Sequence, residues 1–334
     1  MAGPEFDVLA EPDVAAHLVR RKVLLPGDTA TVTVLSGGVS SATYLAETSR
    51  GRFVVKQPLP YLSVADEWPS TVTRAGIEAA AMRTLAGLVP DRLPTLADYD
   101  FERFVLTMSA APARWREWRS ALLDGEVDLA VGSALGRVLG IWHRRTQQDP
   151  AVAAEFASME VFMELRGDPY HRTVACRRPD CAEAVLACLD ELLADRRCLV
   201  HGDFSPKNVL AGPDGLWVLD FEVAHFGHPV FDLAFLTHHL VMKAVHRPDR
   251  VDQLLRCATG FHAGYREAGG PVTGEPTLVR HTGALLLARV HGKSPAAYLT
   301  PAETARVSDL GSRAVHGAVA SVAELFTSRS ATLA

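Results

Sequence analysis

The chain has 334 residues, 48% of them hydrophobic and 22% charged, and a formal net charge of −5 at pH 7, which suits a globular enzyme of one large or two modest domains. The mildly negative net charge gives no sign of a nucleic-acid partner. No apolar run is long enough to cross a bilayer, and we recognise no secretory signal at the start. Five cysteines, an odd number, do not suggest a disulfide framework, so we expect a cytoplasmic protein without nucleic-acid or membrane partners and leave its oligomeric state open.

The first hundred or so residues predict a β-rich region with one principal helix. Runs of β-formers are broken by turn residues at 37–38 and 49–51. A helix start at 69–71 precedes good helix formers with apolar residues at helical spacing. We expect a short helix over 12–21, strands over 31–36, 42–48 and 52–57, a helix over 75–88, and a strand pair over 93–100 and 103–109.

The remainder predicts mostly helices after a connector at 110–113 that contains Pro112. Helical stretches are expected near 127–146, 151–165 and 180–194, then a compact β segment over 198–220, then helices from about 230 to 327. The predicted fold is therefore α+β and bilobal. A small β-rich lobe, residues 1–110, is joined by a short hinge to a larger, mostly helical lobe, residues 111–334.

The most informative segment is 198–222, where an apolar strand leads into His201-Gly202-Asp203 and Asn208 follows five residues after Asp203. A turn at 212–215 then returns an apolar strand to Asp220. Phosphoryl transfer needs one carboxylate beside the attacking hydroxyl and separate oxygen ligands for Mg²⁺. Each residue alone is better explained by a surface hairpin with Asp and Asn in its turns. The loop and the return strand together favour phosphoryl transfer.

The pattern H-G-D-x-x-x-x-N followed by D-F-E resembles the catalytic and metal loops of the aminoglycoside phosphotransferase and choline kinase superfamily, relatives of protein kinases. The resemblance implies that Asp203 is the catalytic base and that Asn208 and Asp220 hold Mg²⁺ for bound ATP. It also implies that His201 braces the loop and that Asp232 supports it by hydrogen bonds, with a helix N-cap as the alternative for Asp232. Lys207 is either a phosphate contact or a solvated loop lysine.

The β-rich region contains residues suited to bind the nucleotide. The turn at 35–41 contains Ser36, Gly37 and Gly38, whose backbone N–H groups can approach phosphates closely, although a plain glycine hairpin is as common. Lys56 follows an apolar strand run, as a phosphate-holding lysine does, and Glu78 in the next helix can pair with it. Solvent-facing side chains are the alternative for both. The adenine is expected against the hinge, near Met108 and Ser109.

A narrower resemblance links the chain to methylthioribose kinases. It rests on the run from Lys56 to Tyr61, on Arg74 and Glu78, and on an Asp-x-Glu pair that implies Glu222 as a further metal ligand; a solvent-facing carboxylate is the alternative. Two features depart from that family: the run Ser-Pro-Lys-Asn in the catalytic loop, and the chain's shorter length. These departures put the phosphate acceptor in doubt.

The acceptor should lie between the catalytic loop and the C-terminal helices. Lysine and arginine outnumber aspartate and glutamate in residues 231–334, which disfavours a polycationic acceptor. Candidate acceptor contacts are Arg289, by loose similarity to methylthioribose kinases, and Lys293, Arg166 and Asp168, with surface or internal ion-pair roles as the alternative for each.

The sequence therefore predicts an ATP- and Mg²⁺-dependent small-molecule kinase that phosphorylates a hydroxyl of a sugar-like or polyol metabolite. A methylthioribose-like pentose is the leading acceptor. An aminoglycoside-type antibiotic or an amino alcohol is the alternative acceptor. A catalytically silent, kinase-like binding protein is the alternative from a different functional class. A protein kinase is disfavoured because the stretch between Asp220 and the helix near 231 is too short for a peptide-docking activation segment.

Overall fold

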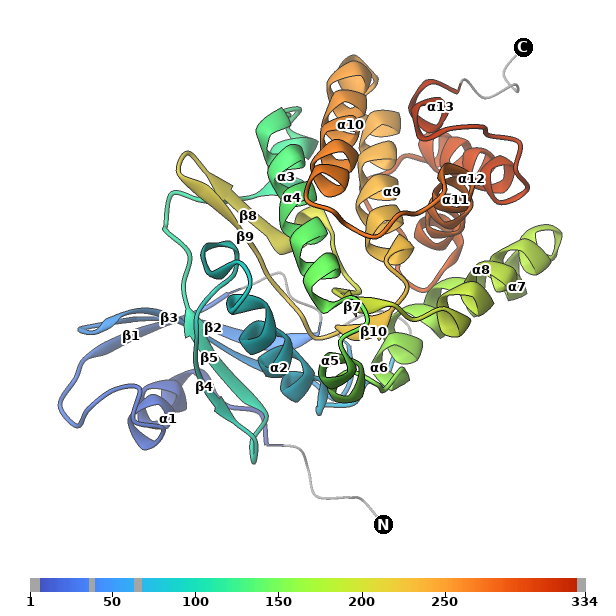
Figure 1. Ribbon diagram of the computed structural model, residues 1–334. Coiled ribbons are helices and arrows are strands. Elements are labelled where there is room, and N and C mark those ends of the chain that lie inside the picture. The colour runs from blue at the N-terminus through green and yellow to red at the C-terminus, as the bar shows by residue number, and fades with distance from the viewer. Residues whose placement is uncertain (1–6, 36–39, 63–67, 329–334) are drawn as a thin grey trace.

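The computed structural model describes residues 7–35, 40–62 and 68–328. An antiparallel sheet with strand order β1-β2-β3-β5-β4 forms the N-terminal part, and Figure 1 shows it on one side of the molecule, with most of the helices on the other. The elements of this part are α1 (Val14–Arg20), β1 (Ala30–Val34), β2 (Ser41–Thr48), β3 (Gly51–Pro58), α2 (Arg74–Ala86), β4 (Leu96–Asp100) and β5 (Val105–Ser109). The predicted β-rich lobe is confirmed.

The alternation of side chains along two central strands sets the two faces of this sheet. Val55 and Val105 pack with α1 in a small hydrophobic cluster. Lys56 and Leu106, which are paired in register, point to the opposite face, where α2 covers the sheet. Leu106 joins the main core of the molecule there. The period of two therefore brings Lys56 to the side that meets the helical part.

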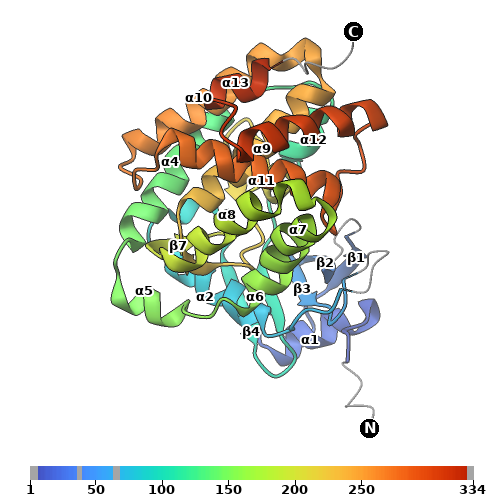
Figure 2. The same ribbon diagram turned by 90° about the vertical axis from the view of Figure 1, so that its right-hand side faces the viewer.

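The C-terminal part is mostly helical, as predicted, with two small β elements. Figure 2 shows α9 and α11 crossing the centre of this part, with α7 and α8 beside them. Its helices are α3 (Trp118–Leu123), α4 (Leu129–Thr146), α5 (Pro150–Glu155), α6 (Glu160–Phe162), α7 (Thr173–Arg177), α8 (Ala182–Ala194), α9 (Val230–His246), α10 (Val251–Glu267), α11 (Glu275–His291), α12 (Pro301–Val315) and α13 (Val322–Thr327). Strands β6 (Arg116–Glu117), β8 (Val209–Gly212) and β9 (Gly215–Val218) form one sheet, and β7 (Cys198–Val200) pairs with β10 (His225–Gly227).

The helix expected over 151–165 is wrong in its boundaries. It is divided into α5 and α6, and the chain then continues as a π-helical segment, Met163–Arg172, that contains Pro169. Proline lacks the N–H that an α-helix needs in its interior, and a wider π turn accommodates it. The sequence pattern identified the apolar periodicity but not this change of helix type.

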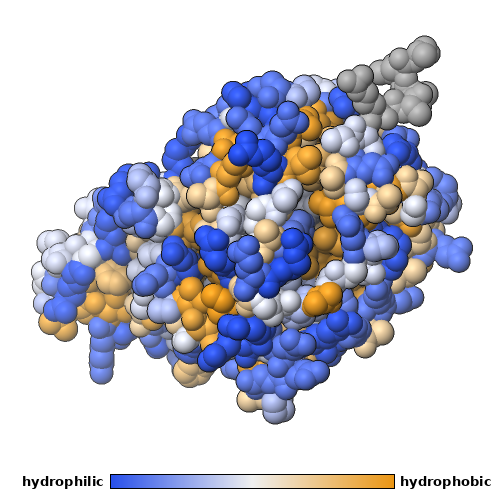
Figure 3. Space-filling model, turned by 45° about the horizontal axis from the view of Figure 1, so that its top comes forward, coloured by the Kyte–Doolittle hydropathy of each residue, from blue (hydrophilic) through white to orange (hydrophobic). Residues whose placement is uncertain are grey.

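No helix in the described part of the chain combines the length and the apolarity needed to span a membrane. On the face seen in Figure 3, hydrophobic areas are small and are separated by hydrophilic side chains. The large apolar side chains are instead concentrated in the core that the helices share with α2 and β5.

Helices α4 and α10 pack unusually closely because three glycines, Gly132, Gly136 and Gly140, lie four residues apart on α4. A Cβ atom added at Gly136 would lie 2.0 Å from the carbonyl oxygen of Phe261 on α10. Residues four apart share one helix face, so the glycines form the contact surface. This packing fixes the positions of His143 on α4 and Tyr265 on α10, which matter for the site below.

We predict that Gly136→Ala destabilises the protein by about 1–3 kcal/mol, because the added methyl group must push two helix backbones apart. In a helix interior without this contact the same substitution would stabilise by about 1 kcal/mol. Gly260→Ala on α10 is the matched control, since its Cβ would have no neighbour nearer than 3.8 Å. Thermal and urea unfolding of both variants measure the difference. Equal unfolding midpoints would contradict the close-packing argument.

Candidate active site

The catalytic loop connects β7 to β8, and hydrogen bonds fix its two polar ends against each other. The Asn208 side chain donates from Nδ2 to the Asp203 carbonyl oxygen at 3.0 Å and to Asp203 Oδ2 at 2.8 Å. The Leu219 amide donates to the Asn208 carbonyl oxygen at 2.8 Å. The β8–β9 hairpin thus brings Asp220 beside the loop, as the sequence pattern predicted.

Two backbone turns in this region adopt left-handed conformations. Gly202 has φ +79°, and a Cβ atom there would lie 2.5 Å from the Val223 carbonyl oxygen, so only glycine fits. Asp220 has φ 68°, a conformation that non-glycine residues rarely adopt and that occurs often at functional sites. The two turns flank the β8–β9 hairpin that brings Asp220 beside the catalytic loop.

Asp232 on α9 holds the start of the catalytic loop. Its carboxylate is completely buried and accepts hydrogen bonds from the amides of His201, at 2.7 Å, and Gly202, at 3.0 Å. His143 Nε2 lies 3.2 Å from the same carboxylate, and His143 Nδ1 lies 2.9 Å from the Tyr265 hydroxyl. Burial acts to raise the pKa of Asp232, but the hydrogen bond and charge of His143, together with His201, keep it below its ordinary value.

The alternative role of Asp232 as a helix N-cap is wrong, because α9 begins at Val230 and Pro229 occupies the cap position. His201 contributes to the same support. Its Nδ1 accepts a hydrogen bond from the Asp203 amide at 3.1 Å, and its Nε2 lies 3.1 Å from the Leu219 carbonyl oxygen. The imidazole therefore connects the loop to the end of β9.

Lys56 joins the sheet to the catalytic region through a cluster of carboxylates. Its Nζ lies 2.7 Å from Glu78 Oε2, 2.5 Å from Asp220 Oδ1 and 3.9 Å from Glu222 Oε2. Burial alone would lower the pKa of Lys56, but Asp220, Glu78 and Glu222 raise it above its ordinary value. Burial raises the pKa of Glu78, an effect that Lys56 only partly offsets. Neither Lys56 nor Glu78 faces solvent.

Arg74, in the first turn of α2, was noted in the sequence only as part of a family resemblance. The side chain is fully buried, donates from Nε to Glu222 Oε2 at 3.1 Å, and donates from Nη2 to the carbonyl oxygens of Ser40 and Leu59 at 2.6 and 2.8 Å. A cation in the first turn of a helix opposes the helix dipole, which was the available sequence signal. Arg74 ties Glu222 to the end of the turn at 35–41.

The donor set fits a divalent cation. One carboxylate oxygen from each of Glu78, Asp220 and Glu222 lies within 4.8 Å of the others. These three acids exceed by one the two cations that pair with them, Lys56 and Arg74, while Lys207 acts on Asp220 through its charge without an ion pair. Among the described residues, both hydrogen bonds of the Asn208 side chain use Nδ2, which leaves its oxygen as a ligand. Oxygen donors with excess negative charge are what Mg²⁺ prefers.

A cavity of about 440 Å³, the sheet-side cavity, lies between the sheet and the catalytic hairpin. Met108 and Ser109 line it, as expected for the hinge, together with Lys56, Glu78 and Asn208. Apolar contacts come from both parts of the chain: Leu35, Val54, Leu210, Trp217 and Leu219. Ser36, Gly37 and Gly38 lie outside the described residues, but their neighbours Leu35 and Ser40 line this cavity.

A second cavity, of about 550 Å³, the helix-side cavity, lies against α9 and α11. Asp203 and Glu222 line it, and Ser40, Arg119, Lys207 and Asp220 line both cavities. Arg166 lies here, with Nη2 3.1 Å from Asp203 Oδ2 and Nε donating to the Gly202 carbonyl oxygen at 2.9 Å. Arg289 lines the same cavity. Asp203 therefore faces the helix-side cavity and Asn208 the sheet-side one.

The structure places Asp168 and Lys293 outside both cavities, which corrects the expectation that they face the cleft. They line a separate cavity of about 400 Å³, and the Asp168 carboxylate pairs with Arg172 at 2.8 Å. Residues two apart on a helix do not share a face, so Arg166 points toward Asp203 while Asp168 does not. Lys293 comes after the end of α11. It lines the separate cavity, whereas Arg289, within α11, lines the helix-side cavity.

Several lining residues of the helix-side cavity were missed by the sequence analysis. Phe235, His239 and Lys243 lie four residues apart on α9 and all line it, as do Tyr170 and Tyr298. Residues spaced by four share one face of a helix. A lysine continuing an aromatic stripe in an otherwise apolar helix was the signal that could have identified Lys243.

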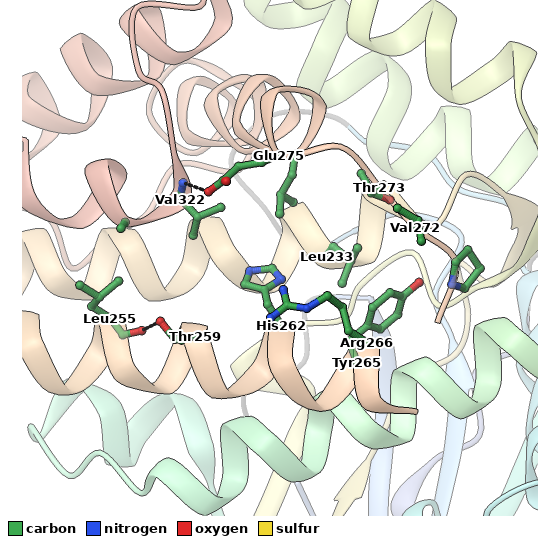
Figure 4. Close-up of a pocket in the computed structure, with 13 residues that line it drawn as sticks. Leu233, Leu255, Thr259, His262, Tyr265, Arg266, Val272, Thr273, Glu275 and Val322 are labelled. Carbon is green, nitrogen blue, oxygen red and sulfur yellow. Dashed lines mark hydrogen bonds between the residues drawn. The ribbon is translucent and has the colours of Figure 1, made fainter. Parts of the chain in front are cut away.

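Figure 4 shows a further cavity, of about 270 Å³, lined by residues of α9, α10, α11 and α13. Glu275 is the only acid that lines it, and its Oε1 accepts a hydrogen bond from the Val322 amide at 2.9 Å. Tyr265 reaches this cavity with its ring. Lacking the carboxylate cluster of the central cleft, this cavity is not the candidate active site.

The chain is similar in sequence to methylthioribose kinases. The methylthioribose kinase of Geobacillus kaustophilus is 26% identical over 273 residues, which cover 73% of this chain and 68% of that enzyme. The methylthioribose kinase of Bacillus cereus (strain ATCC 10987 / NRS 248) is 25% identical over 232 residues, 60% of this chain and 58% of that enzyme. The chain thus spans between 58% and 68% of the length of these relatives.

Solved structures share the fold at low sequence identity. The amicoumacin kinase hAmiN in complex with AMP-PNP, Ca²⁺ and Ami superposes with a TM-score of 0.55 at 14% identity, covering 94% of this chain and 97% of that chain. A choline/ethanolamine kinase family protein from Mesorhizobium loti superposes with a TM-score of 0.52 at 16% identity, covering 92% and 98%. The predicted bilobal kinase-like fold is therefore confirmed.

The sequence model of the phosphotransferase enzyme family, APH, matches residues 31–271. The match extends from β1 past the end of α10 and includes the catalytic loop, the carboxylate cluster and Lys56. Because it covers most of the chain, the protein belongs to the APH phosphotransferase enzyme family.

Proposed function

We propose that the protein is an ATP-dependent kinase that transfers the γ-phosphate to a hydroxyl of a small, sugar-like or polyol metabolite, with a methylthioribose-like pentose as the leading acceptor. One observation carries the proposal. Two cavities meet at Asp220, with Asp203 in one and Lys56 in the other. This arrangement suits a nucleotide between the lobes 1–110 and 111–334, with its terminal phosphate directed at a hydroxyl beside Asp203.

In this proposal Asp203 accepts the proton of the acceptor hydroxyl, a role typically worth 10²–10⁴-fold in rate. Arg166 and Asn208, both within hydrogen-bonding distance of Asp203 Oδ2, hold that carboxylate in one orientation. Lys56, fixed by Glu78, binds the phosphates of ATP. Met108 and Ser109 contact the adenine, and Ser36, Gly37 and Gly38, which lie outside the described residues, are assigned to the phosphates from the sequence alone.

Asn208 and Asp220 hold Mg²⁺, with Glu222 as a further ligand. The ion, when bound, neutralises charge on the transferring phosphate. Burial alone would raise the pKa of Asp220, but Lys56 and Lys207 keep it below its ordinary value, so the carboxylate is ionised and available as a ligand at neutral pH. The excess negative charge of the cluster supports this assignment.

The names of the relatives support both the reaction and the class of acceptor. Methylthioribose kinase names a pentose acceptor, and the amicoumacin kinase was solved with a nucleotide analogue and a divalent cation. An aminoglycoside-type acceptor is disfavoured because five cations line the helix-side cavity and outnumber its three acids, which disfavours a polycation. The cations are Arg119, Arg166, Lys207, Lys243 and Arg289, and the acids are Asp203, Asp220 and Glu222.

We predict that Asp203→Asn lowers acceptor-dependent ADP release at least 100-fold while the fold and MgATP binding persist, because only proton acceptance is lost. A coupled assay over methylthioribose, other deoxypentoses, choline, homoserine and aminoglycosides measures ADP release, and calorimetry measures MgATP binding. Asp168→Asn is the matched control and should retain activity. Unchanged turnover in Asp203→Asn would reject the assignment.

We predict that Asp220→Asn removes the stimulation of AMP-PNP binding by Mg²⁺, because a metal ligand and one partner of Lys56 are lost together. Calorimetric titration of AMP-PNP with Mg²⁺ and with EDTA compares the variant with the wild type. Asp249→Asn, at an exposed carboxylate paired with Arg247, is the control. Equal Mg²⁺ dependence in Asp220→Asn and wild type would exclude Asp220 as the metal ligand.

A further inference from the structure

The helix-side cavity contains polar side chains whose charge and hydrogen bonds have no partner. Lys243 on α9 is fully buried, and its Nζ has no hydrogen-bond partner in the described part of the chain. The Nζ atom lies over the ring of Tyr298, 5.3 Å from its centroid. A buried ammonium without an anion is unfavourable, so it calls for a functional explanation.

Two further donors of the same cavity are unpaired. Arg289 Nε and the Tyr298 hydroxyl are buried without hydrogen-bond partners among the described residues. Arg289 uses only Nη1, which donates to Ser294 Oγ at 2.9 Å and to the Tyr170 hydroxyl at 3.4 Å. Lys243, Arg289 and Tyr298 come from different segments yet line one cavity. All three residues therefore border the same space.

Cations outnumber acids in the lining of this cavity: Arg119, Arg166, Lys207, Lys243 and Arg289 against Asp203, Asp220 and Glu222. Arg119 also lines this cavity but is paired with Glu117 at 2.7 Å, and Arg166 is paired with Asp203. Lys243 and Arg289 have no carboxylate partner among the described residues. Two uncompensated cations and a hydroxyl donor match one group that carries negative charge on several oxygens. A neutral hydroxyl could satisfy one donor but would leave both charges uncompensated.

We propose that the acceptor carries an acidic group, a carboxylate or a phosphoryl group, which Lys243, Arg289 and Tyr298 bind in the helix-side cavity. The proposal rests on the proposed kinase function, since it places this acid in the same cavity as Asp203. It narrows the proposed sugar-like or polyol acceptor to one that also carries an acidic group. The hydroxyl of such an acceptor would be directed to Asp203 while its acidic group is held by α9 and α11.

Titration of Lys243 gives this binding a proton signature. Burial, then the charges of Arg289 and Arg119, lower the pKa of Lys243 to about 7, and Glu117 acts in the opposite direction. Of its other neighbours, Tyr298 presents its ring and His239 lies one turn earlier on α9. An acid bound beside Lys243 favours the ammonium, so binding at pH 8 should take up a proton. Calorimetry in buffers of different ionisation enthalpy measures this uptake.

The experiment compares matched neutral and acidic probes: glycerol with glycerate, and ribose with ribonate and ribose 5-phosphate. Calorimetric titration of the full chain should detect the acids and not their neutral counterparts, and ribonate against ribose 5-phosphate decides between carboxylate and phosphoryl. Lys243→Met and Arg289→Met should each weaken acid binding about 10- to 100-fold. Arg256→Met, which removes an exposed charge from α10, is the matched control and should not.

Lys243→Met should also unfold at the same temperature as wild type or higher, since it replaces a buried amine that has no hydrogen-bond partner among the described residues by an apolar side chain. A folding failure is therefore not expected to obscure the result. Equal binding of neutral and acidic probes, absence of acid binding, or acid binding that survives in both cavity variants would overturn the proposal. ADP release with the same probes distinguishes failure of the proposed acid site from failure of the proposed kinase function. Release with neutral acceptors alone rejects the acid site but keeps the kinase. Acid binding without release by any acceptor keeps the site and rejects the kinase.

Discussion

The structure depends on one buried charge cluster that joins its two parts. Lys56 and Arg74 from the sheet side meet Glu78, Asp220 and Glu222, and every member is at least largely buried. Taking five charges out of water is costly unless each is paired, so the cluster forms only when the sheet, α2 and the catalytic hairpin are all in position. The same cluster carries one excess negative charge, which makes the junction of the two parts a cation site.

The catalytic loop is held from behind by a second, independent constraint. Asp232 receives two loop amides and one imidazole, and that imidazole is oriented by Tyr265. His143 belongs to α4 and Tyr265 to α10, and the backbones of these two helices approach closely at the glycines of α4. Helix packing remote from the cleft therefore determines where Asp203 lies. Gly202 and Asp220 can keep their left-handed backbone conformations because the hydrogen bonds and packing around the loop hold them in place.

The residues that could be predicted from the sequence are those brought together by a short stretch of chain or by the order of neighbouring elements. Asp203 and Asn208 precede the β8–β9 hairpin and Asp220 follows it, so their meeting follows from one short segment. The succession of strand lysine and helix glutamate likewise predicted the pairing of Lys56 with Glu78. Side-chain direction over longer distances could not be predicted. Arg166 and Asp168 differ by two positions yet face different cavities, because helix phase within the π-helical segment around Pro169 is not readable from periodicity.

The cations of the helix-side cavity illustrate the same limit more sharply. Lys243 and Arg289 lie 46 positions apart in the sequence, on separate helices, and each alone resembles an ordinary surface cation. Only the packing of α9 against α11 shows that neither has an acidic partner. The reaction of such a fold is thus encoded in a short segment, whereas the acceptor is encoded in the mutual placement of distant helices. A regional excess of basic residues in the sequence indicated the sign of the charge, and the buried, unpaired Nζ of Lys243 indicates where that charge acts.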